Sequence, residues 1–140
     1  MLNLDLTTEF GARVARRLSE ERIIWLTTVR ASGAPEPSPV WFLWDGATAL
    51  IYSRPNTQKL RNIARSASVA LSFNSSPSGG DVIVLAGTAV VDDQALPADQ
   101  LAAYVAKYAG PIKDINMTPE LFGKAYSVAV RVTPTSVRGH

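Results

Sequence analysis

The chain has 140 residues, 46% of them hydrophobic and 19% charged, so we expect one folded domain spanning residues 1–140 rather than a disordered chain. It has no cysteine and a lone histidine, His140, which excludes disulfides, cysteine nucleophiles and metal sites that need thiolates or two imidazoles. The net charge of +2 is too small to indicate nucleic-acid binding, and the absence of a long apolar run or a secretory signal leads us to expect a cytoplasmic protein without a membrane span.

The first twenty residues have the pattern of an amphipathic helix. Its apolar residues recur every four positions: Leu6, Phe10, Val14 and Leu18. The polar residues near its start are candidate N-caps: Asp5, Thr7 and Thr8. Glu9 and Arg13 have the i, i+4 spacing of a helical ion pair.

Three strands are expected next, separated by turns. β-branched and aromatic residues predict the first over residues 23–29. The second covers residues 35–44, where Pro35 and Pro37 restrict its beginning to a sheet edge and Asp45-Gly46 favours a tight turn at its end. The third covers residues 48–53.

The middle of the chain alternates a short helix with two more strands. Asn56 or Thr57 can cap a helix that runs through Arg65. Strands are predicted over residues 69–73 and 81–91, joined by a polar loop over residues 74–80. Gly87 is expected to mark a bulge or bend in the second of these strands.

The C-terminal third predicts two helices and a last strand. Pro97 suits the first turn of a helix whose apolar stripe is Leu101, Tyr104, Val105 and Tyr108. We expect Gly110-Pro111 to end that helix and Thr118-Pro119 to begin another short one. The last strand is expected over residues 126–133.

Six strands joined mostly as hairpins, with helices between them, predict a mainly β fold with α-helices, a small antiparallel barrel. Alternate residues of a strand point to opposite faces, so Trp41, Phe42 and Trp44 cannot all point into such a barrel. Some of these rings must pack on a helix or on a second subunit, and we expect a homodimer.

Most catalytic motifs are missing from the sequence. A Ser-His-Asp triad would depend on the terminal His140, and Asp92-Asp93 reads as a pair of solvated charges at the end of a strand. The loop over residues 76–80 lacks the spacing and the following lysine of a phosphate-binding glycine loop. No residue stands out as a proton donor, and no metal site is expected.

The segment over residues 52–62 is the strongest candidate site. A strand ends there, turns and enters a helix, so backbone N–H groups can converge on an anion together with side-chain hydroxyls and cations. The side chains in question are Ser53, Arg54, Thr57, Lys59 and Arg61. The alternative is a capped surface helix whose basic residues are solvated.

Over nearly its whole length the chain resembles the split β-barrel superfamily of flavin and deazaflavin oxidoreductases, which is related to pyridoxamine-phosphate oxidase. The motifs that carry the resemblance are Leu26-Thr27-Thr28-Val29-Arg30, Ser38-Pro39-Val40-Trp41-Phe42 and Tyr52-Ser53-Arg54-Pro55-Asn56-Thr57-Gln58-Lys59-Leu60-Arg61-Asn62-Ile63. Within the superfamily the sequence is most similar to the actinobacterial branch that uses coenzyme F420. The resemblance implies a split-barrel fold, a homodimer and F420-dependent hydride transfer to a conjugated small molecule.

The resemblance also implies which residues bind the cofactor. Lys59 would meet its phosphate with Thr57 beside it, while Tyr52, Ser53 and Arg61 lie in the same segment. Four residues of the second strand would line the deazaflavin ring: Ser38, Pro39, Val40 and Trp41. Basic residues such as Arg54, Arg61 and those of 13–17 could attract the anionic tail of F420.

Three other interpretations remain open. An enzyme of the same fold could use FMN, and a small dimer without acid-base residues could simply store a cofactor or a tetrapyrrole. A nucleic-acid-binding barrel would need aromatic and basic residues interleaved on exposed strands, whereas residues 40–44 contain neither lysine nor arginine.

Overall fold

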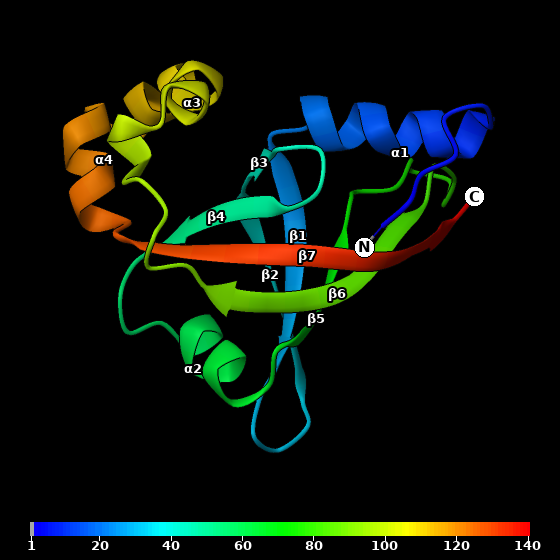
Figure 1. Cartoon of the computed structure of the whole chain (residues 1–140), viewed down its shortest axis with the longest axis horizontal. Coiled ribbons are helices and arrows are strands. Elements are labelled where there is room, and N and C mark those ends of the chain that lie inside the picture. Colours follow the sequence, from blue (N-terminus) through cyan, green and yellow to red (C-terminus); the bar gives the residue numbers. More distant parts are fainter. Residues whose placement is uncertain (1) are drawn as a thin grey trace.

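Residues 2–140, which the computed structural model describes, form an antiparallel seven-stranded sheet that curls over on itself and carries helices on its outside (Figure 1). The strands are β1 (Ile23–Val29), β2 (Pro35–Trp41), β3 (Leu43–Trp44), β4 (Ala49–Ser53), β5 (Ser68–Ser72), β6 (Ile83–Val91) and β7 (Val128–Gly139). The helices are α1 (Glu9–Glu20), α2 (Gln58–Arg65), the 3₁₀ turn η1 (Ala98–Gln100), α3 (Ala102–Asp114) and α4 (Pro119–Ala125). The mainly β, barrel-like class expected from the sequence is confirmed.

The strand order in the sheet is β2-β1-β5-β6-β7-β4-β3. In Figure 1 the strands β4, β7 and β6 run across the view, while β1 and β2 cross behind them, so the two halves of the sheet face each other. Apolar residues of both halves fill the space between them, among them Ile24, Leu26, Ile51, Leu71 and Val130. Val14 and Leu18 of α1 close one end of this first core.

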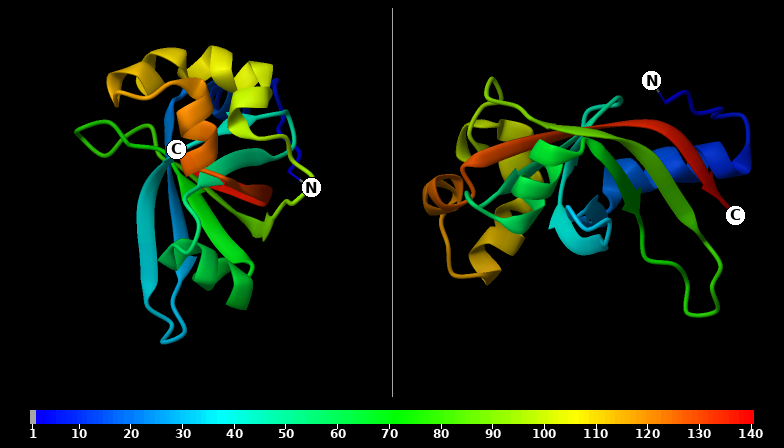
Figure 2. Two further views of the ribbon diagram at one scale, coloured as in Figure 1. Left: turned by 90° about the vertical axis from the view of Figure 1, so that its left-hand side faces the viewer. Right: turned by 90° about the horizontal axis from the view of Figure 1, so that it is seen from below.

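A second core lies on the outer face of β4. Helices α3 and α4 pack there at one end of the molecule, and α1 lies at the other (Figure 2). All five residues of β4 are buried because Ala49 and Ile51 face the first core while Leu50 and Tyr52 face the second. The strand β4 therefore connects the barrel to the helical pair.

The prolines of β2 explain its position at the sheet edge. Pro35, Pro37 and Pro39 have no N–H, yet β2 pairs with β1 without a break from Val29↔Pro35 to Ile23↔Trp41. The alternate residues between the prolines must therefore supply the N–H groups that bond to β1, and the outer edge of β2 loses its donors. This arrangement confirms the predicted edge position and blocks the addition of another strand.

Gly87 lies at an irregularity in the pairing of β6 with β7, but the extra residue, Thr135, belongs to β7 and not to β6 as predicted. The pairing with β7 shifts between Ala86 and Gly87, and a Cβ atom at residue 87 would collide with the carbonyl group of Thr133. Glycine allows the two strands to approach closely at this bend. Beyond it, β7 continues to pair with β6 as far as Gly139, so the last strand is longer than the predicted 126–133.

The prediction of six strands was wrong because the strand expected over residues 35–44 is interrupted at Phe42. The N–H group of Phe42 donates to the Tyr108 hydroxyl at 2.8 Å, and its carbonyl accepts from the Lys107 ammonium at 2.7 Å. Side chains of α3 thus replace a neighbouring strand at this residue. Residues before the break pair with β1, and those after it form β3, which pairs with β4.

Two helix boundaries also differ from the prediction. Helix α1 begins only at Glu9, capped by the Thr8 side chain, which accepts from the Gly11 N–H at 3.0 Å, and Leu6 lies before it, 64% exposed. Helix α3 does not end at Gly110-Pro111 but runs on to Asp114. Gly110 has no Cβ to clash with the proline ring, and continuing the helix buries Ile112 in the second core.

The three aromatic residues around this break all find packing partners within one chain. Phe42 is fully buried in the first core, Trp44 packs against that core, and Trp41 packs on α3 and α4. Of the two alternatives drawn from the sequence, packing on a helix is the one realised, so these rings do not by themselves require a second subunit. No helix in the described part of the chain has the length and apolar character needed to cross a membrane.

Candidate functional site

A pocket of about 240 Å³ lies where the end of β2, the strand β4, α2 and the helical pair α3–α4 meet. Most of its wall is aromatic or aliphatic. The residues that line it are Pro39, Val40, Trp41, Tyr52, Lys59, Tyr104, Ile115, Phe122 and Tyr126. An aromatic pocket with a few polar groups is the usual form of a site for a planar organic ligand.

Five of the residues predicted from the sequence meet in this pocket. Pro39, Val40 and Trp41 come from the end of β2, Tyr52 from β4 and Lys59 from the first turn of α2. They are up to twenty residues apart in the sequence. The curled sheet and the anchoring of α2 bring them to one place.

Asn62 anchors α2 to the sheet. Its buried side-chain amide donates to the hydroxyl of Thr28 at 2.9 Å and to the carboxylate of Glu36 at 3.1 Å, and accepts from Gln58 at 2.8 Å. These bonds tie the helix to both β1 and β2. Because Lys59 lies one turn earlier in α2, the same bonds fix where its side chain begins.

The Lys59 ammonium is half-buried and forms no ion pair with a carboxylate within residues 2–140. Burial lowers its pKa below the ordinary value for lysine, since the charged form loses hydration there. A cation held in a pocket without a counter-ion favours an anionic ligand.

The turn between β4 and α2 leaves the start of the helix open. Asn56 has a left-handed backbone with φ of 62°, and Thr57 occupies the N-cap position without making a side-chain capping bond. Its hydroxyl instead lies 3.2 Å from the hydroxyl of Ser53. The first-turn N–H groups of α2 are therefore not capped by Thr57, on the helix that carries Lys59.

The other predicted residues lie outside the pocket wall. Ser38 is half-buried in β2, and Ser53 is buried beneath the turn, where its hydroxyl donates to the carbonyl of Arg54 at 2.8 Å. Arg61 is exposed and donates to the carbonyl of Asn56 and to the side chain of Gln58. Thr57 does not line the pocket, although it lies two positions before Lys59, which does.

The basic residues proposed for an anionic tail divide into two groups. Arg13 and Arg17 of α1 both pair with Asp81, and α1 lies at the end of the molecule away from α4 (Figure 2). Arg54 lies beside the pocket instead, with its guanidinium carbon 4.7 Å from the ring centre of Tyr126. Arg54 is therefore placed to contact a ligand that extends from the pocket.

A column of stacked rings forms one wall of the pocket. Trp41 stacks on Tyr108 with ring centres 4.8 Å apart and on Phe122 at 5.3 Å, and Phe122 stacks on Tyr126 at 4.4 Å. These spacings leave no room for another ring inside the column. A planar ligand must therefore lie against the column rather than within it.

Sequence reasoning missed the wall contributed by α3 and α4. Tyr104 was assigned to the apolar stripe of a helix, and Ile115, Phe122 and Tyr126 were not considered for the site. The available signal was the excess of aromatic residues around Trp41, which indicated a packing partner outside the barrel. The pattern could not show which helix supplies it.

The sequence matches the family model described as Pyridoxamine 5'-phosphate oxidase over residues 10–140. The chain belongs to this family. The match covers every strand and most of α1, in agreement with the curled antiparallel sheet. No curated protein sequence matches the chain significantly.

Solved structures that are similar to this chain belong to proteins with different names and roles. An F420 reductase superposes with a TM-score of 0.67 and 28% identity, covering 88% of this chain and 94% of that one. General Stress Protein 26 from Bacillus anthracis gives a TM-score of 0.66 at 16% identity, covering 90% and 89%. The heme storage protein from Vibrio cholerae gives 0.64 at 11% identity, covering 94% and 95%. The last two likenesses concern the fold alone.

Proposed function

We propose that this member of the pyridoxamine 5'-phosphate oxidase family is an oxidoreductase that binds coenzyme F420 in the pocket around Trp41 and Lys59. In this proposal it transfers a hydride between the deazaflavin and a conjugated small molecule. The similarity to an F420 reductase at 28% identity favours F420 over FMN.

The observation that carries the proposal is the position of Lys59. A half-buried ammonium without a carboxylate partner in the described residues lines a pocket whose other walls are aromatic or aliphatic. This donor set fits a ligand that combines a planar ring with a phosphate, because the ring can lie against Trp41 and the phosphate can pair with Lys59.

The chain's own residues bind and orient rather than react. The edges of the stacked Trp41, Phe122 and Tyr126 rings form an apolar wall that excludes water from one side of a bound ring. Lys59 and the uncapped first turn of α2 would hold the phosphate, and Arg54 the chain beyond it. The deazaflavin, when bound, supplies the hydride chemistry itself.

The size of the pocket supports a site completed by a second copy of the chain. Its volume of about 240 Å³ is below the ~300 to 1,000 Å³ typical of small-molecule sites. One chain therefore provides room for a ring system but not for the rest of a cofactor. We propose that the remainder is enclosed by a partner subunit in a homodimer.

Storage of a tetrapyrrole is the alternative from a different class, because one structural relative is a heme storage protein. The usual imidazole ligand of heme iron is not at this pocket. His140 lies at the C-terminal end of β7, on the side of the molecule away from α4 (Figure 2). The alternative is tested together with the proposal.

A titration with F420, FMN and hemin at one ionic strength separates the three possibilities. Trp41 lines the pocket, so binding should quench tryptophan fluorescence, and Trp41→Phe should lose part of that signal. Trp44→Phe is the matched control because Trp44 packs on the barrel core instead. We expect F420 to bind more tightly than FMN. Micromolar FMN binding without a response to F420 would contradict the assignment, and a response to hemin alone would indicate storage.

A further inference from the structure

Tyr104 carries a buried hydroxyl that forms no hydrogen bond within residues 2–140. The side chain is completely buried, with 0% of its surface exposed. Its two neighbours in the second core behave differently. The Tyr52 hydroxyl donates to the carbonyl of Leu96 at 2.6 Å, and the Tyr108 hydroxyl donates to the carbonyl of Arg22 at 2.6 Å. Tyr104 is thus the exception among the buried tyrosines of this cluster.

The Tyr104 ring is held from several sides. Its centre lies 4.9 Å from Tyr52 in an edge-to-face contact, 4.8 Å from Tyr108 and 6.0 Å from Phe122. These contacts fix the position of the ring and so of its hydroxyl. An unsatisfied buried hydroxyl costs about 1 to 3 kcal/mol of folding stability, so its retention calls for an explanation.

The pocket supplies that explanation, because Tyr104 is one of the residues that line it. Burial raises the pKa of this phenol far above its ordinary value, so the hydroxyl stays protonated and can act as a hydrogen-bond donor. The surrounding wall is aromatic or aliphatic, and Lys59 comes from a different element, α2. A ligand that satisfies Tyr104 must then be flat, largely apolar and equipped with an acceptor on its ring.

We propose that Tyr104 is a specificity-determining residue that donates a hydrogen bond to a carbonyl oxygen on a planar conjugated ring bound in the pocket. The inference rests on the proposed function, since it assigns the ring end of the same site. Two sources share this chemistry: a ring carbonyl of the deazaflavin, or the carbonyl of a conjugated substrate such as a quinone.

Tyr104→Phe tests the proposal because it removes the hydroxyl and leaves the ring. Without ligand, the variant should unfold at the same temperature as the wild type or higher, since no bond is lost and an unsatisfied group is removed. Tyr108→Phe is the matched control. It deprives the Arg22 carbonyl and the Phe42 N–H of their partner and should lower the thermal midpoint.

Binding titrations then identify the source of the carbonyl. If it belongs to the cofactor, Tyr104→Phe should weaken F420 binding about three- to tenfold, the contribution of a neutral hydrogen bond. If it belongs to the substrate, F420 binding should be unchanged and the dissociation constant for 1,4-naphthoquinone should rise by a similar factor. Either result supports the proposal.

The contradicting outcomes are distinct from one another. Unchanged affinity for both F420 and naphthoquinone, in a protein that binds F420, would overturn the role of Tyr104 and leave the proposed function intact. A thermal midpoint lowered as far as that of Tyr108→Phe would assign Tyr104 a purely structural hydrogen bond. A wild-type chain that binds none of these probes would overturn both proposals.

Discussion

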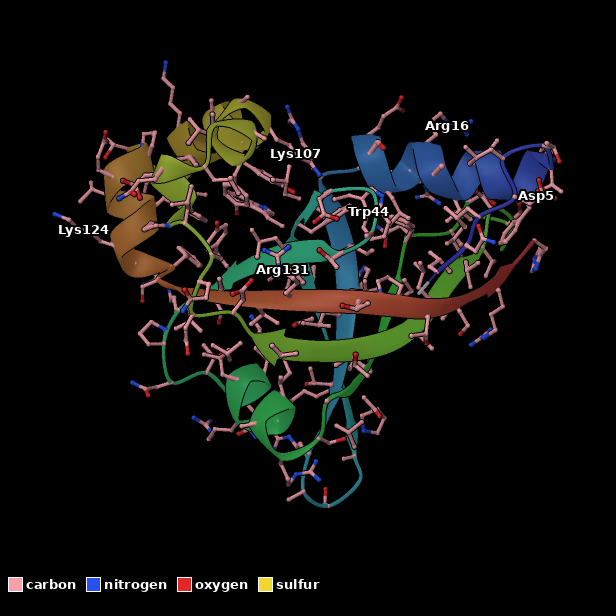
Figure 3. All side chains as sticks on the ribbon, viewed as in Figure 1. Asp5, Arg16, Trp44, Lys107, Lys124 and Arg131 are labelled. Carbon is pink, nitrogen blue, oxygen red and sulfur yellow. The ribbon has the colours of Figure 1, made fainter. Side chains whose placement is uncertain are left out.

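Lys107 and Lys59 are half-buried amines with different surroundings. Figure 3 shows Lys107 between α3 and the end of α1. Its ammonium donates to the carbonyl of Phe42 and lies 4.0 Å from the centre of the Phe42 ring. The contact contributes to the break between β2 and β3, so Lys107 has a structural role that Lys59, facing the pocket, does not share.

Lys107 should make the stability of the protein depend on pH. Burial lowers its pKa to about 8, whereas the unfolded chain keeps the ordinary value of 10.5. Between these values the unfolded state binds a proton that the folded state has released, so the free energy of unfolding should rise from about pH 8 toward pH 10. Above pH 10 the trend should reverse, because burial raises the pKa of Tyr108 to about 12 and the unfolded tyrosines ionise first.

Urea denaturation at half-unit steps between pH 7 and pH 10 measures this dependence. Lys107→Met should reduce the rise seen for the wild type. Lys124→Met is the control, because Lys124 points away from the molecule at its outer end in Figure 3 and should retain the wild-type slope. An equal rise in the wild type and in Lys107→Met would show that the amine keeps its ordinary affinity for protons.

At the scale of single elements, features of the strands were predictable where the backbone chemistry of one residue determines how the strand can pair. The prolines of β2 placed it at an edge because proline lacks an N–H wherever it occurs. Gly87 marked the place where the pairing of β6 with β7 is irregular, because glycine lets two strands approach closely. The ends of β7 were not predictable. Its extension to Gly139 depends on pairing with Ile83 of β6, a residue more than fifty positions earlier in the chain.

The errors at this scale share one cause, tertiary contacts that override local preference. The sequence predicts that Phe42 lies inside a strand, but α3 supplies its hydrogen bonds through Tyr108 and Lys107. Pro111 predicts the end of a helix, but burial of Ile112 in the second core stabilises the extra turn. Neither contact can be inferred from the residues beside it.

The part of the candidate site whose residues lie close together in the sequence was predictable. Lys59 and Tyr52 belong to a continuous segment in which a strand leads into a helix, and the residues Pro39 to Trp41 lie on the neighbouring hairpin. The wall from α3 and α4 could not be predicted from the sequence, because its residues become part of the site only when the helical pair packs on β4. Tyr104 looked like a core residue, and it is one, apart from its unpaired hydroxyl.

At the scale of the whole molecule, one chain leaves apolar surface uncovered. Val90, Val91 and Leu96 lie close together in the sequence around the end of β6, and each is at least 40% exposed. Exposed apolar residues of this kind are common at subunit interfaces. Together with the small volume of the pocket, they support association of two copies.

Sedimentation at micromolar concentration tests the association, with and without F420. We expect a dimer whose interface exceeds the ~1,000 Å² of a stable biological contact. Binding of F420 should strengthen it if the partner encloses part of the cofactor. A species of 15.0 kDa under both conditions would contradict the prediction.

The central claim is that Lys59 holds the phosphate of a cofactor whose ring lies in the pocket, and the F420 dissociation constant of Lys59→Ala tests it most directly. Losing a charge-assisted hydrogen bond of about 1.5 to 3 kcal/mol should weaken binding roughly ten- to a hundredfold, with an unchanged thermal midpoint. Arg65→Ala removes a cation from the last turn of the same helix, outside the pocket wall, and should bind F420 as the wild type does. Unaltered F420 affinity in a stable Lys59→Ala variant, or an equal loss in Arg65→Ala, would contradict the account.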